Sequence, residues 1–453
     1  MTAVRIGPDR LARYDVPGPR YTSYPTVPAW QTPFGAAEYR EALQDLAGLA
    51  QDPVSVYVHL PFCGYRCHYC ACTVALATRP DVVDRYLDHV EHELELVTDI
   101  AGRSRPVLQL HLGGGTPNHL TVGQLERLAR MLEDRFTFAP AAERSVAADP
   151  RLASREGIEA LRALGFRRIS YGVQDFDPAV QAAIGRPQSE AVVRAAVELA
   201  RAAGFAGVNI DLIYGLPLQS PSRFARTLES ALALAPDRMA CYSYAHVPDA
   251  RHNQRLIDAA TLPSREQKFE LFQMAVEAFV GAGYEWIGMD HFARPADDLA
   301  AAARERRLHR DFMGYTTRPA PHLLGFGMSA IGDVAGRFVQ NVPRTGAYQR
   351  ALDEGTLPVE RGHRLSDDDQ RRRRAILTLM CNLELPHRLV PLPEEDAHAR
   401  LRPLVAEGLL AAHADRYEVT PVGRYFLRNV AMALDAYLPQ PGPGTRPRFS
   451  RTV

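Results

Sequence analysis

The stretch VSVYVHLPFCGYRCHYCAC at residues 54–72 joins an apolar run of β-forming residues to cysteines in the spacing C-x3-C-x2-C. The apolar run predicts a buried strand, and Cys63, Cys67 and Cys70 follow in the loop directly after it. Three thiolates on one tight loop can bind three irons of a 4Fe-4S cubane and leave the fourth iron open. An open iron can bind a small chelating ligand, so we expect a reactive cluster at the end of this strand.

A zinc knuckle is the alternative interpretation of these cysteines. It needs a fourth ligand, which Cys72 or His68 could supply. The cluster is favoured because zinc-binding cysteine pairs normally lie far apart in a sequence, whereas these three cysteines lie close together. The chain has only six cysteines in 453 residues, too few for a disulfide scaffold, and Cys241 and Cys381 are interpreted as ordinary buried residues.

After this first strand, short runs rich in Val, Ile, Leu and Tyr alternate with longer runs of helical period as far as about residue 285. The expected strands are 54–60, 107–112, 144–149, 167–173, 207–215 and 239–246. The expected helices are 81–100, 121–135, 152–164, 188–203 and 222–235. Several strands end in polar or glycine residues that must converge, and a barrel brings the carboxyl ends of its strands together. We therefore expect a complete or partial barrel rather than a doubly wound sheet.

Composition divides the chain into four expected parts. They are an arm with a short helix at 1–52, the barrel at 53–300, a mainly helical, winged-helix-like carboxyl-terminal domain at 301–435 and a disordered tail at 436–453. Arginine-rich helices are expected at 300–310 and 368–382.

The charge balance excludes some classes of partner. The 53 basic and 53 acidic residues cancel, so no field of one sign favours nucleic acid or an anionic membrane surface. No apolar run reaches membrane-spanning length, and the first residues lack the apolar core of a signal peptide. We expect a cytoplasmic protein that binds no nucleic acid and holds any anionic substrate with local basic groups.

Further motifs resemble one enzyme family over nearly the whole chain. They are PRYTSYPT at 19–26, YVHLPFC at 57–63, LHLGGGTP at 110–117, GVQDF at 172–176, NIDLIYGLP at 209–217, GMDHFARP at 288–295 and GYTT at 314–317. With the cysteine spacing and an aromatic residue before the third cysteine, they resemble the oxygen-independent coproporphyrinogen III oxidases of the radical S-adenosylmethionine (SAM) superfamily. The resemblance implies an α/β fold, a partial (β/α)6 TIM-like barrel of the radical SAM type.

The same resemblance implies the reaction. In that family a reduced cluster and SAM generate a carbon radical that takes hydrogen from a propionate side chain, after which carbon dioxide and one electron leave. Two such events turn coproporphyrinogen III into protoporphyrinogen IX. Because a radical performs the difficult step, no acid-base catalytic side chain is predicted. An unidentified one-electron donor and a monomeric chain are further implications, and Cys72 is implied not to bind the cluster.

By resemblance, two SAM molecules bind per chain. The cluster-bound SAM would be held by Tyr57, Gly114 and Ile331, and the second SAM by Tyr69, Gly115, Thr116, Gln174, Arg186, Asp211 and Ala245. The residues alone leave an alternative for the glycines of LHLGGGTP: they suit either a close approach of backbone to a ligand or a tight strand-to-helix turn.

The sequence departs from the family pattern at two positions. Ala147 stands where the family usually has a glutamate that contacts the cluster-bound SAM, and Met313 stands where glutamine is common. Strand alternation places Glu143, Ser145 and Asp149 on the same face as Ala147, so a neighbour could partly substitute for the missing carboxylate.

Two other functions therefore stay open beside the oxidase. One is a radical SAM enzyme that modifies another tetrapyrrole, and the other is a haem-binding carrier without turnover. The PRYTSYPT arm and the GYTT segment favour the oxidase. Arg20 on the arm is a candidate partner for the substrate's propionates, although a solvated arginine is an equally good interpretation.

Overall fold

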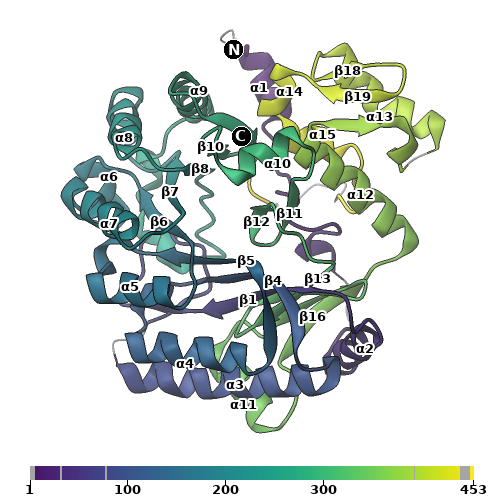
Figure 1. Ribbon diagram of the computed structural model, residues 1–453. Coiled ribbons are helices and arrows are strands. Elements are labelled where there is room, and N and C mark those ends of the chain that lie inside the picture. The colour runs from purple at the N-terminus through teal and green to yellow at the C-terminus, as the bar shows by residue number, and fades with distance from the viewer. Residues whose placement is uncertain (1–5, 31–32, 77–78, 392, 439–448, 453) are drawn as a thin grey trace.

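The computed structural model describes residues 6–30, 33–76, 79–391, 393–438 and 449–452. Six parallel strands form the centre of a twelve-stranded sheet, in the spatial order β1, β4, β5, β6, β7, β8 (Figure 1). They are Val54–Leu60, Arg105–Gly114, Phe136–Ala148, Arg168–Gln174, Gly207–Tyr214 and Arg238–Ser243. The sheet runs from β16 at one edge to β9 at the other, so the barrel is partial, as expected.

Helices connect these strands and cover the outer face of the sheet (Figure 1). They are α3 Pro80–Ala101, α4 Val122–Glu133, α5 Arg155–Ala163, α6 Pro178–Ala183, α7 Glu190–Ala202, α8 Pro221–Ala233 and α9 Arg265–Gly281. Short 3-10 turns lie between them: η2 Pro117–His119, η3 Pro150–Leu152, η4 His252–Leu256 and η5 Ala259–Thr261. Several helices begin at a polar N-cap residue. At the start of α4, for example, the Thr121 side chain accepts a hydrogen bond from the backbone N–H of Gln124.

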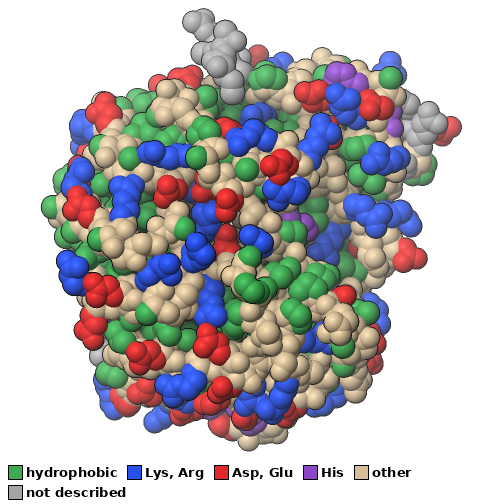
Figure 2. All heavy atoms as spheres, in the orientation of Figure 1, with side chains coloured by type: hydrophobic (Ala, Val, Ile, Leu, Met, Phe, Trp, Pro, Cys, Tyr) green, Lys and Arg blue, Asp and Glu red, His purple; other side chains and the backbone are tan. Residues whose placement is uncertain are grey.

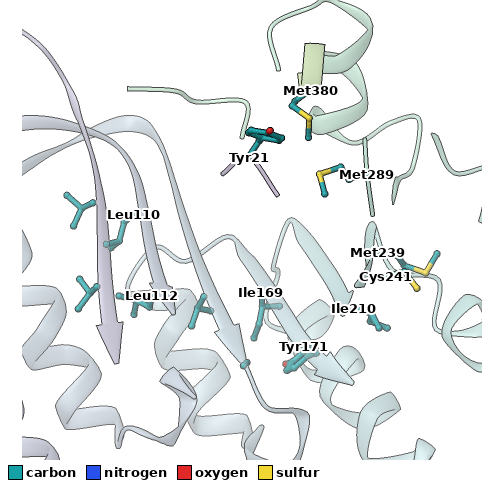
Figure 3. Close-up of a cluster of buried hydrophobic side chains, with 14 of the residues drawn as sticks. Tyr21, Leu110, Leu112, Ile169, Tyr171, Ile210, Met239, Cys241, Met289 and Met380 are labelled. Atoms are coloured by element: carbon teal, nitrogen blue, oxygen red, sulfur yellow. The ribbon is translucent and has the colours of Figure 1, made fainter. Parts of the chain in front are cut away.

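Along each strand, side chains point alternately to the hydrophobic core and to the inside of the barrel. Leu110 and Leu112 of β4, like Ile169 of β6 and Ile210 of β7, point toward the outer helices and are buried (Figure 3). The residues between them point to the opposite face, so His111, Ser170 and Asp211 line a cavity inside the barrel.

The sheet continues beyond residue 300. Strand β13 (His322–Phe326) pairs in parallel with β1, and three antiparallel strands follow it. These are β14 Ile331–Val334, β15 Arg337–Asn341 and β16 Val359–Arg364, with α11 Thr345–Asp353 before the last. At the other edge lie β10 His291–Ala293 and β9 Glu285–Gly288. The division of the chain into domains stays a prediction, but the expected boundary at 300 does not coincide with the end of the sheet.

The helix expected at 300–310 is wrong in its second half. Helix α10 spans Asp298–Arg304, and Arg306 then adopts a positive φ of 57°, which no α-helix continues through. The chain next forms a hairpin of β11 (His309–Asp311) and β12 (Gly314–Thr316).

The carboxyl-terminal part contains a small antiparallel sheet in the order β17, β19, β18, with helices around it. Its elements are α12 Asp367–Asn382, β17 Glu384–Pro386, η6 His387–Leu389, α13 Glu394–Ala406, β18 Leu410–Ala412, β19 Arg416–Val419, α14 Pro421–Tyr425 and α15 Leu427–Met432. In Figure 1 this part lies beside α1, at the opposite side of the molecule from α3 and α4.

The amino-terminal arm begins beside the carboxyl-terminal part, at α1, and ends at α2, which packs against α3 and the β14–β15 edge of the sheet (Figure 1). It contains α1 Pro8–Tyr14, η1 Val27–Ala29 and α2 Ala36–Ala47. Tyr21 is 1% exposed, lies beside Met289 and Met380 (Figure 3) and donates to Asp435 at 2.9 Å. These contacts fix the PRYTSYPT segment above the strand ends.

Most of the tail predicted to be disordered, residues 439–448 and 453, lies outside the described residues. For residues 450–452 the prediction is wrong, because their backbone bonds to the arm. Gly18 N–H donates to the carbonyl of Ser450 at 3.0 Å, and Thr452 N–H donates to that of Val16 at 2.8 Å.

On the face shown in Figure 2, Lys and Arg side chains are interspersed with Asp and Glu, in agreement with the balanced charge of the chain. Among the described residues, no helix has the length and apolar character that crossing a membrane requires.

Candidate active site

The three cysteines lie in a loop that follows β1 at the carboxyl edge of the sheet, called here the cluster loop (residues 61–74). At its start, β2 (Phe62–Cys63) pairs with β3 (Ala75–Leu76), which directly follows the loop. The end of β4 lies against the start of the loop, because Gly115 N–H donates to Leu60 and Thr116 N–H donates to Phe62, both at 2.8 Å. The loop is therefore anchored to the neighbouring strand.

The glycines after β4 are required by this close approach. A Cβ on Gly114 would lie 2.7 Å from the His59 ring, and its φ is 107°. A Cβ on Gly115 would lie 2.5 Å from the carbonyl carbon of Pro61. The tight-turn interpretation of LHLGGGTP thus has a structural basis of its own, whether or not a ligand also contacts these residues.

A second support of the cluster loop comes from η4, which the sequence did not indicate. The Asn253 side-chain amide lies within 3.1 Å of the carbonyl oxygens of Cys67, His68 and Cys70. Gln254, 0% exposed, donates to the carbonyl of Tyr69 at 2.9 Å. Four consecutive peptide groups of the loop are thus held from about 185 residues away.

Each of the three thiols has a hydrogen-bonding neighbour. Cys63 Sγ lies 3.3 Å from the Thr116 hydroxyl, and the Arg186 guanidinium donates to Cys67 Sγ at 3.5 Å. Burial raises the pKa of Cys63 and of Cys67, whereas a hydrogen bond from the Cys72 side chain lowers the pKa of Cys70. Hydrogen bonds to sulfur stabilise thiolates, the form that binds iron.

The donor set suits a cubane. Within the described part of the chain, no three His, Cys, Asp or Glu side chains are grouped so that they could hold one metal ion. Three thiolates that each bind a different iron need not converge on one point. Three thiols on one loop are therefore compatible with the cluster that the cysteine spacing predicts.

The thiols open into a cavity of about 720 Å³. Besides the three cysteines, it is lined by nine of the ten residues expected to contact SAM: Tyr57, Tyr69, Gly114, Gly115, Thr116, Gln174, Arg186, Asp211 and Ile331. Ala245 does not line it; its carbonyl accepts from the Gln254 side chain at 3.2 Å.

Both histidines beside Tyr57 are uncharged near neutral pH. The Tyr57 hydroxyl lies 3.0 Å from His59 Nδ1, and its ring stacks on that of His111 with 6.0 Å between centroids. Burial lowers the pKa of His59 and that of His111 to about 4. This wall of the cavity is therefore aromatic and uncharged.

Arg186 and Asp149 bring charge to the lining of the cavity. Arg186 contacts Asp149 at 3.2 Å and donates to the Gly172 carbonyl at 2.5 Å. Burial raises the pKa of Asp149, and Arg186 opposes that shift. The two residues lie 37 positions apart in the sequence, and no motif connects them as a pair.

The surroundings of Ala147 limit which neighbour could replace the family's glutamate. Glu143 pairs with Arg168 at 2.9 Å, and Ser145 Oγ bonds to His111 Nδ1 at 2.8 Å. Of the three neighbours considered, only Asp149 lines the main cavity.

A second cavity of about 200 Å³ shares part of its lining with the main cavity. Both cavities share Ala147, Met313, His111, Ser170, Asp211 and Tyr242. Asp211 accepts from Ser170 at 2.9 Å and from Asn209 at 2.8 Å, and burial raises its pKa. The two positions that depart from the family pattern thus lie together, between the cavities.

Comparisons with known proteins show which family the chain belongs to. The model of the radical SAM superfamily matches residues 57–231, and that of the HemN carboxyl-terminal domain matches residues 365–426. An oxygen-independent coproporphyrinogen III oxidase of Pseudomonas aeruginosa is 40% identical over 463 residues, covering 100% of both chains. That of Escherichia coli is 40% identical, covering 98% of this chain and 97% of its own.

The chain belongs to the oxygen-independent coproporphyrinogen III oxidase family. The solved structure of the Escherichia coli coproporphyrinogen III oxidase (HemN), described as a radical SAM enzyme, superposes with a TM-score of 0.87. It is 40% identical in sequence and covers 92% of this chain and 98% of that chain.

Membership of the radical SAM superfamily implies a 4Fe-4S cluster and SAM. The residues present fit both groups, because the thiols and a cavity large enough for a cofactor meet at one end of the barrel.

Proposed function

We propose that this chain decarboxylates two propionate side chains of coproporphyrinogen III to vinyl groups without oxygen, giving protoporphyrinogen IX. The printed names of its full-length relatives support this assignment. The observation that carries it in the structure is that the three cysteines and nine of the ten expected SAM contacts line one cavity. Six separate strand-helix units contribute to that cavity, which is how a barrel builds a reaction site.

We propose for each cluster and SAM residue the role that the family resemblance implies. Cys63, Cys67 and Cys70 hold the cluster, and Tyr57, Gly114 and Ile331 contact the SAM bound to it. A second SAM is proposed at Tyr69, Gly115, Thr116, Gln174, Arg186, Asp211 and Ala245. Ala245 is the weakest member of this set, because it lies outside the cavity lining.

The cluster and SAM together would supply one-electron chemistry at the substrate. The chain's own task is to orient these groups and to exclude water. Thr116 and Arg186 bond the cysteine sulfurs, and the Tyr57 and His111 rings present an uncharged wall. No side chain is assigned a proton transfer, because the group that leaves as carbon dioxide is a carboxylate, which has no proton to remove.

Arg20 is proposed to hold a substrate carboxylate. Its guanidinium pairs with Asp290 and lies 5.6 Å from the centre of the Tyr242 ring, which lines the cavity. The side chain is still 32% exposed, so part of the guanidinium can bind a second carboxylate. Arg20 and Tyr242 thus connect the arm to the reaction site.

Ala147 and Met313 favour one other candidate, a radical SAM enzyme that acts on a different tetrapyrrole. Both residues face the cavity and replace polar side chains expected from the resemblance, so the fit of the substrate can differ. The carrier without turnover has no comparable observation in its favour. We further infer a cytoplasmic monomer that receives electrons from a separate donor.

An anaerobic product assay tests the proposal. The reconstituted protein is incubated with coproporphyrinogen III, SAM and dithionite, and the tetrapyrroles and 5'-deoxyadenosine are separated by chromatography. Protoporphyrinogen IX should form together with 5'-deoxyadenosine. Cleavage of SAM with intact coproporphyrinogen III would favour the other tetrapyrrole enzyme, and haem binding without any SAM cleavage would favour the carrier.

A further inference from the structure

Arg310, on strand β11, is a buried arginine whose guanidinium is almost without partners among the described residues. It is 3% exposed, and its one hydrogen bond there runs from Nη2 to the carbonyl of Arg20 at a long 3.5 Å. Its Nε and Nη1 atoms are buried and have no partner. The guanidinium otherwise lies over the Tyr315 ring, 4.6 Å from the ring centre. Such an arrangement is costly, because a buried cation needs both hydrogen bonds and a counter-charge.

The other buried arginines of the described chain are all satisfied. Four of them are between 3% and 6% exposed: Arg105, Arg186, Arg337 and Arg428. Arg105 and Arg428 each donate to three backbone carbonyls. Arg186 and Arg337 each form an ion pair with an aspartate. The fold thus pairs its buried arginines elsewhere, which sets Arg310 apart.

Little negative charge lies beside Arg310. Arg20 pairs with Asp290, and in the described part of the chain no ion pair joins Arg310 to that carboxylate or to Asp311. Burial raises the pKa of Asp290, but Arg20, His291 and Arg310 together hold it well below its usual range. Asp311 is the next residue of the strand, so it points to the other face, and it accepts from a backbone N–H there. Arg20 and Arg310 therefore share one ionised carboxylate and leave a positive charge in excess.

The hairpin places Arg310 directly behind the lining of the reaction site. On the same hairpin, Met313 lines the main cavity and Tyr315 lines the second cavity. Tyr242 lines both cavities and lies near both arginines. Arg20 is 5.6 Å from the centre of its ring, and Arg20 and Arg310 both oppose the rise that burial causes in its pKa. The excess positive charge is thus next to the space that the substrate is proposed to occupy.

A small cavity of about 10 Å³ borders Arg310, and residues 21–24 of the arm also line it. A space of this size holds one water molecule at most. A water can accept a hydrogen bond, but only an anion also neutralises the charge, and a carboxylate matches the planar fork of a guanidinium. Because a carboxylate needs more room, its binding requires the arm to shift away from the hairpin.

We propose that Arg310, together with Arg20, binds a propionate carboxylate of the tetrapyrrole that does not react. The inference rests on the proposed function, in which two propionates lose carbon dioxide and the others stay on the macrocycle. Two-point pairing with a guanidinium fixes the plane of a carboxylate, so Arg310 orients the macrocycle in the cavity. The arm moves to admit this carboxylate and then covers it, which couples substrate binding to the seating of the arm.

The test compares two buried arginines by equilibrium binding. The reconstituted protein is titrated without oxygen with coproporphyrin III, the oxidised and fluorescent form of the substrate, and with its tetramethyl ester, which has the same ring but no carboxylates. The variants are Arg310→Met, which removes the charge, and Arg310→Lys, which keeps it as a point charge. Arg105→Met is the matched control, since Arg105 is equally buried but lines neither cavity. The Tm of each protein is measured in parallel.

We expect Arg310→Met to bind coproporphyrin III at least about tenfold more weakly than the parent, because it loses a charge-assisted hydrogen bond. Its Tm should equal or exceed that of the parent, since a buried cation without partners has been removed. Its affinity for the ester should be unchanged, and Arg310→Lys should bind the acid with intermediate affinity. Arg105→Met should show the reverse, a lower Tm with the affinity of the parent.

Equal affinity of parent and Arg310→Met for coproporphyrin III would overturn the proposal. An equal loss of affinity for the acid and the ester would also overturn it, because the defect would then lie in the shape of the site. So would a lower Tm without a loss of affinity specific to the acid, because Arg310 would then serve the fold alone.

Product assays with coproporphyrinogen III separate this inference from the proposed function. If coproporphyrin III binds in an Arg310-dependent way but the parent protein leaves coproporphyrinogen III intact, the carboxylate site stands and the reaction assignment fails. If the parent forms protoporphyrinogen IX and Arg310→Met does so with the same KM, the reaction assignment stands and the carboxylate site fails.

Discussion

Cys67 is the most enclosed of the three cysteines in the cluster loop. Its side chain is 7% exposed, and its sulfur accepts from Arg186. Replacing it with serine removes one of the three thiolates that a site-differentiated cubane needs. We predict that Cys67→Ser, after anaerobic reconstitution with iron and sulfide, loses the visible absorption of the 4Fe-4S cluster and all SAM cleavage.

Cys381→Ala is the control for this variant, since Cys381 is also buried but lies on α12, far along the chain from the loop. It should keep its iron and sulfide content. A full cluster spectrum in Cys67→Ser would remove the assignment of the ligands.

Some candidate site residues can be proposed from sequence and others cannot. The cysteine spacing points to a candidate site because all three thiols belong to one short segment, and their role as cluster ligands stays a prediction. Asn253 and Gln254 could not be predicted in the same way, because RHNQRL has no pattern that relates it to a loop about 185 residues earlier. The disorder predicted for the last residues failed because only tertiary contacts, such as that of Thr452 with Val16, order them.

At the scale of elements, η4 stabilises the cluster loop. Asn253→Ala removes the donor to three loop carbonyls. We predict a loss of about 1–3 kcal/mol in stability and faster release of iron to a chelator. His252→Ala changes the exposed neighbour and should release iron at the parent rate; equal rates for both variants would show that the Asn253 contacts do not hold the loop.

Glu93 joins α3 to β15, to α11 and to the turn that follows β13. It is fully buried and accepts from Gly327 N–H at 2.7 Å and from the Asn341 amide and the Tyr348 hydroxyl at 2.6 Å. Burial raises the pKa of Glu93 to about 7. Between its unfolded pKa and this value the folded state binds more protons than the unfolded state, so the Glu93 contribution to stability falls as pH rises.

We therefore predict a pH-dependent effect of Glu93→Gln. The Tm of the variant minus that of the parent should increase from pH 5 to pH 8, by a free-energy equivalent on the order of 3 kcal/mol. Thermal unfolding at several pH values measures it. A difference in Tm that does not change with pH would mean that the carboxyl group does not titrate in this range.

The order of elements was predictable as far as β8 and not beyond. The alternating pattern predicted six strands and the helices between them, because each strand-helix unit is formed by consecutive residues. Strand β13 reads HLLGF and carries no sign that it pairs with β1, more than 260 residues earlier. The hairpin β11–β12 was likewise missed, because the arginine-rich run at 304–310 that leads into it also suits a helix.

At the scale of the whole molecule, Arg428 ties both ends of the chain together. It is 5% exposed and donates to the carbonyls of Gly18, Pro19 and Arg451. Arg428→Lys cannot reach all three, so we predict a loss of about 2–4 kcal/mol in stability and faster tryptic cleavage in the arm. Arg371→Lys, on the exposed face of α12, should match the parent in urea unfolding and proteolysis. Unchanged behaviour of Arg428→Lys would mean that the arm is held by other contacts.

The arrangement of the molecule as a whole places the arm over the strand ends and the cluster loop at the rim of the same cavity. Its chemistry depends on one feature of that loop, namely that the three thiolates leave one iron free to bind SAM.

Electron paramagnetic resonance of the reconstituted, dithionite-reduced protein, recorded without and with SAM, measures this directly. We predict the signal of a reduced 4Fe-4S cluster whose g values change when SAM is added. A spectrum that stays the same at saturating SAM, or a protein that carries zinc at these cysteines, would contradict the account.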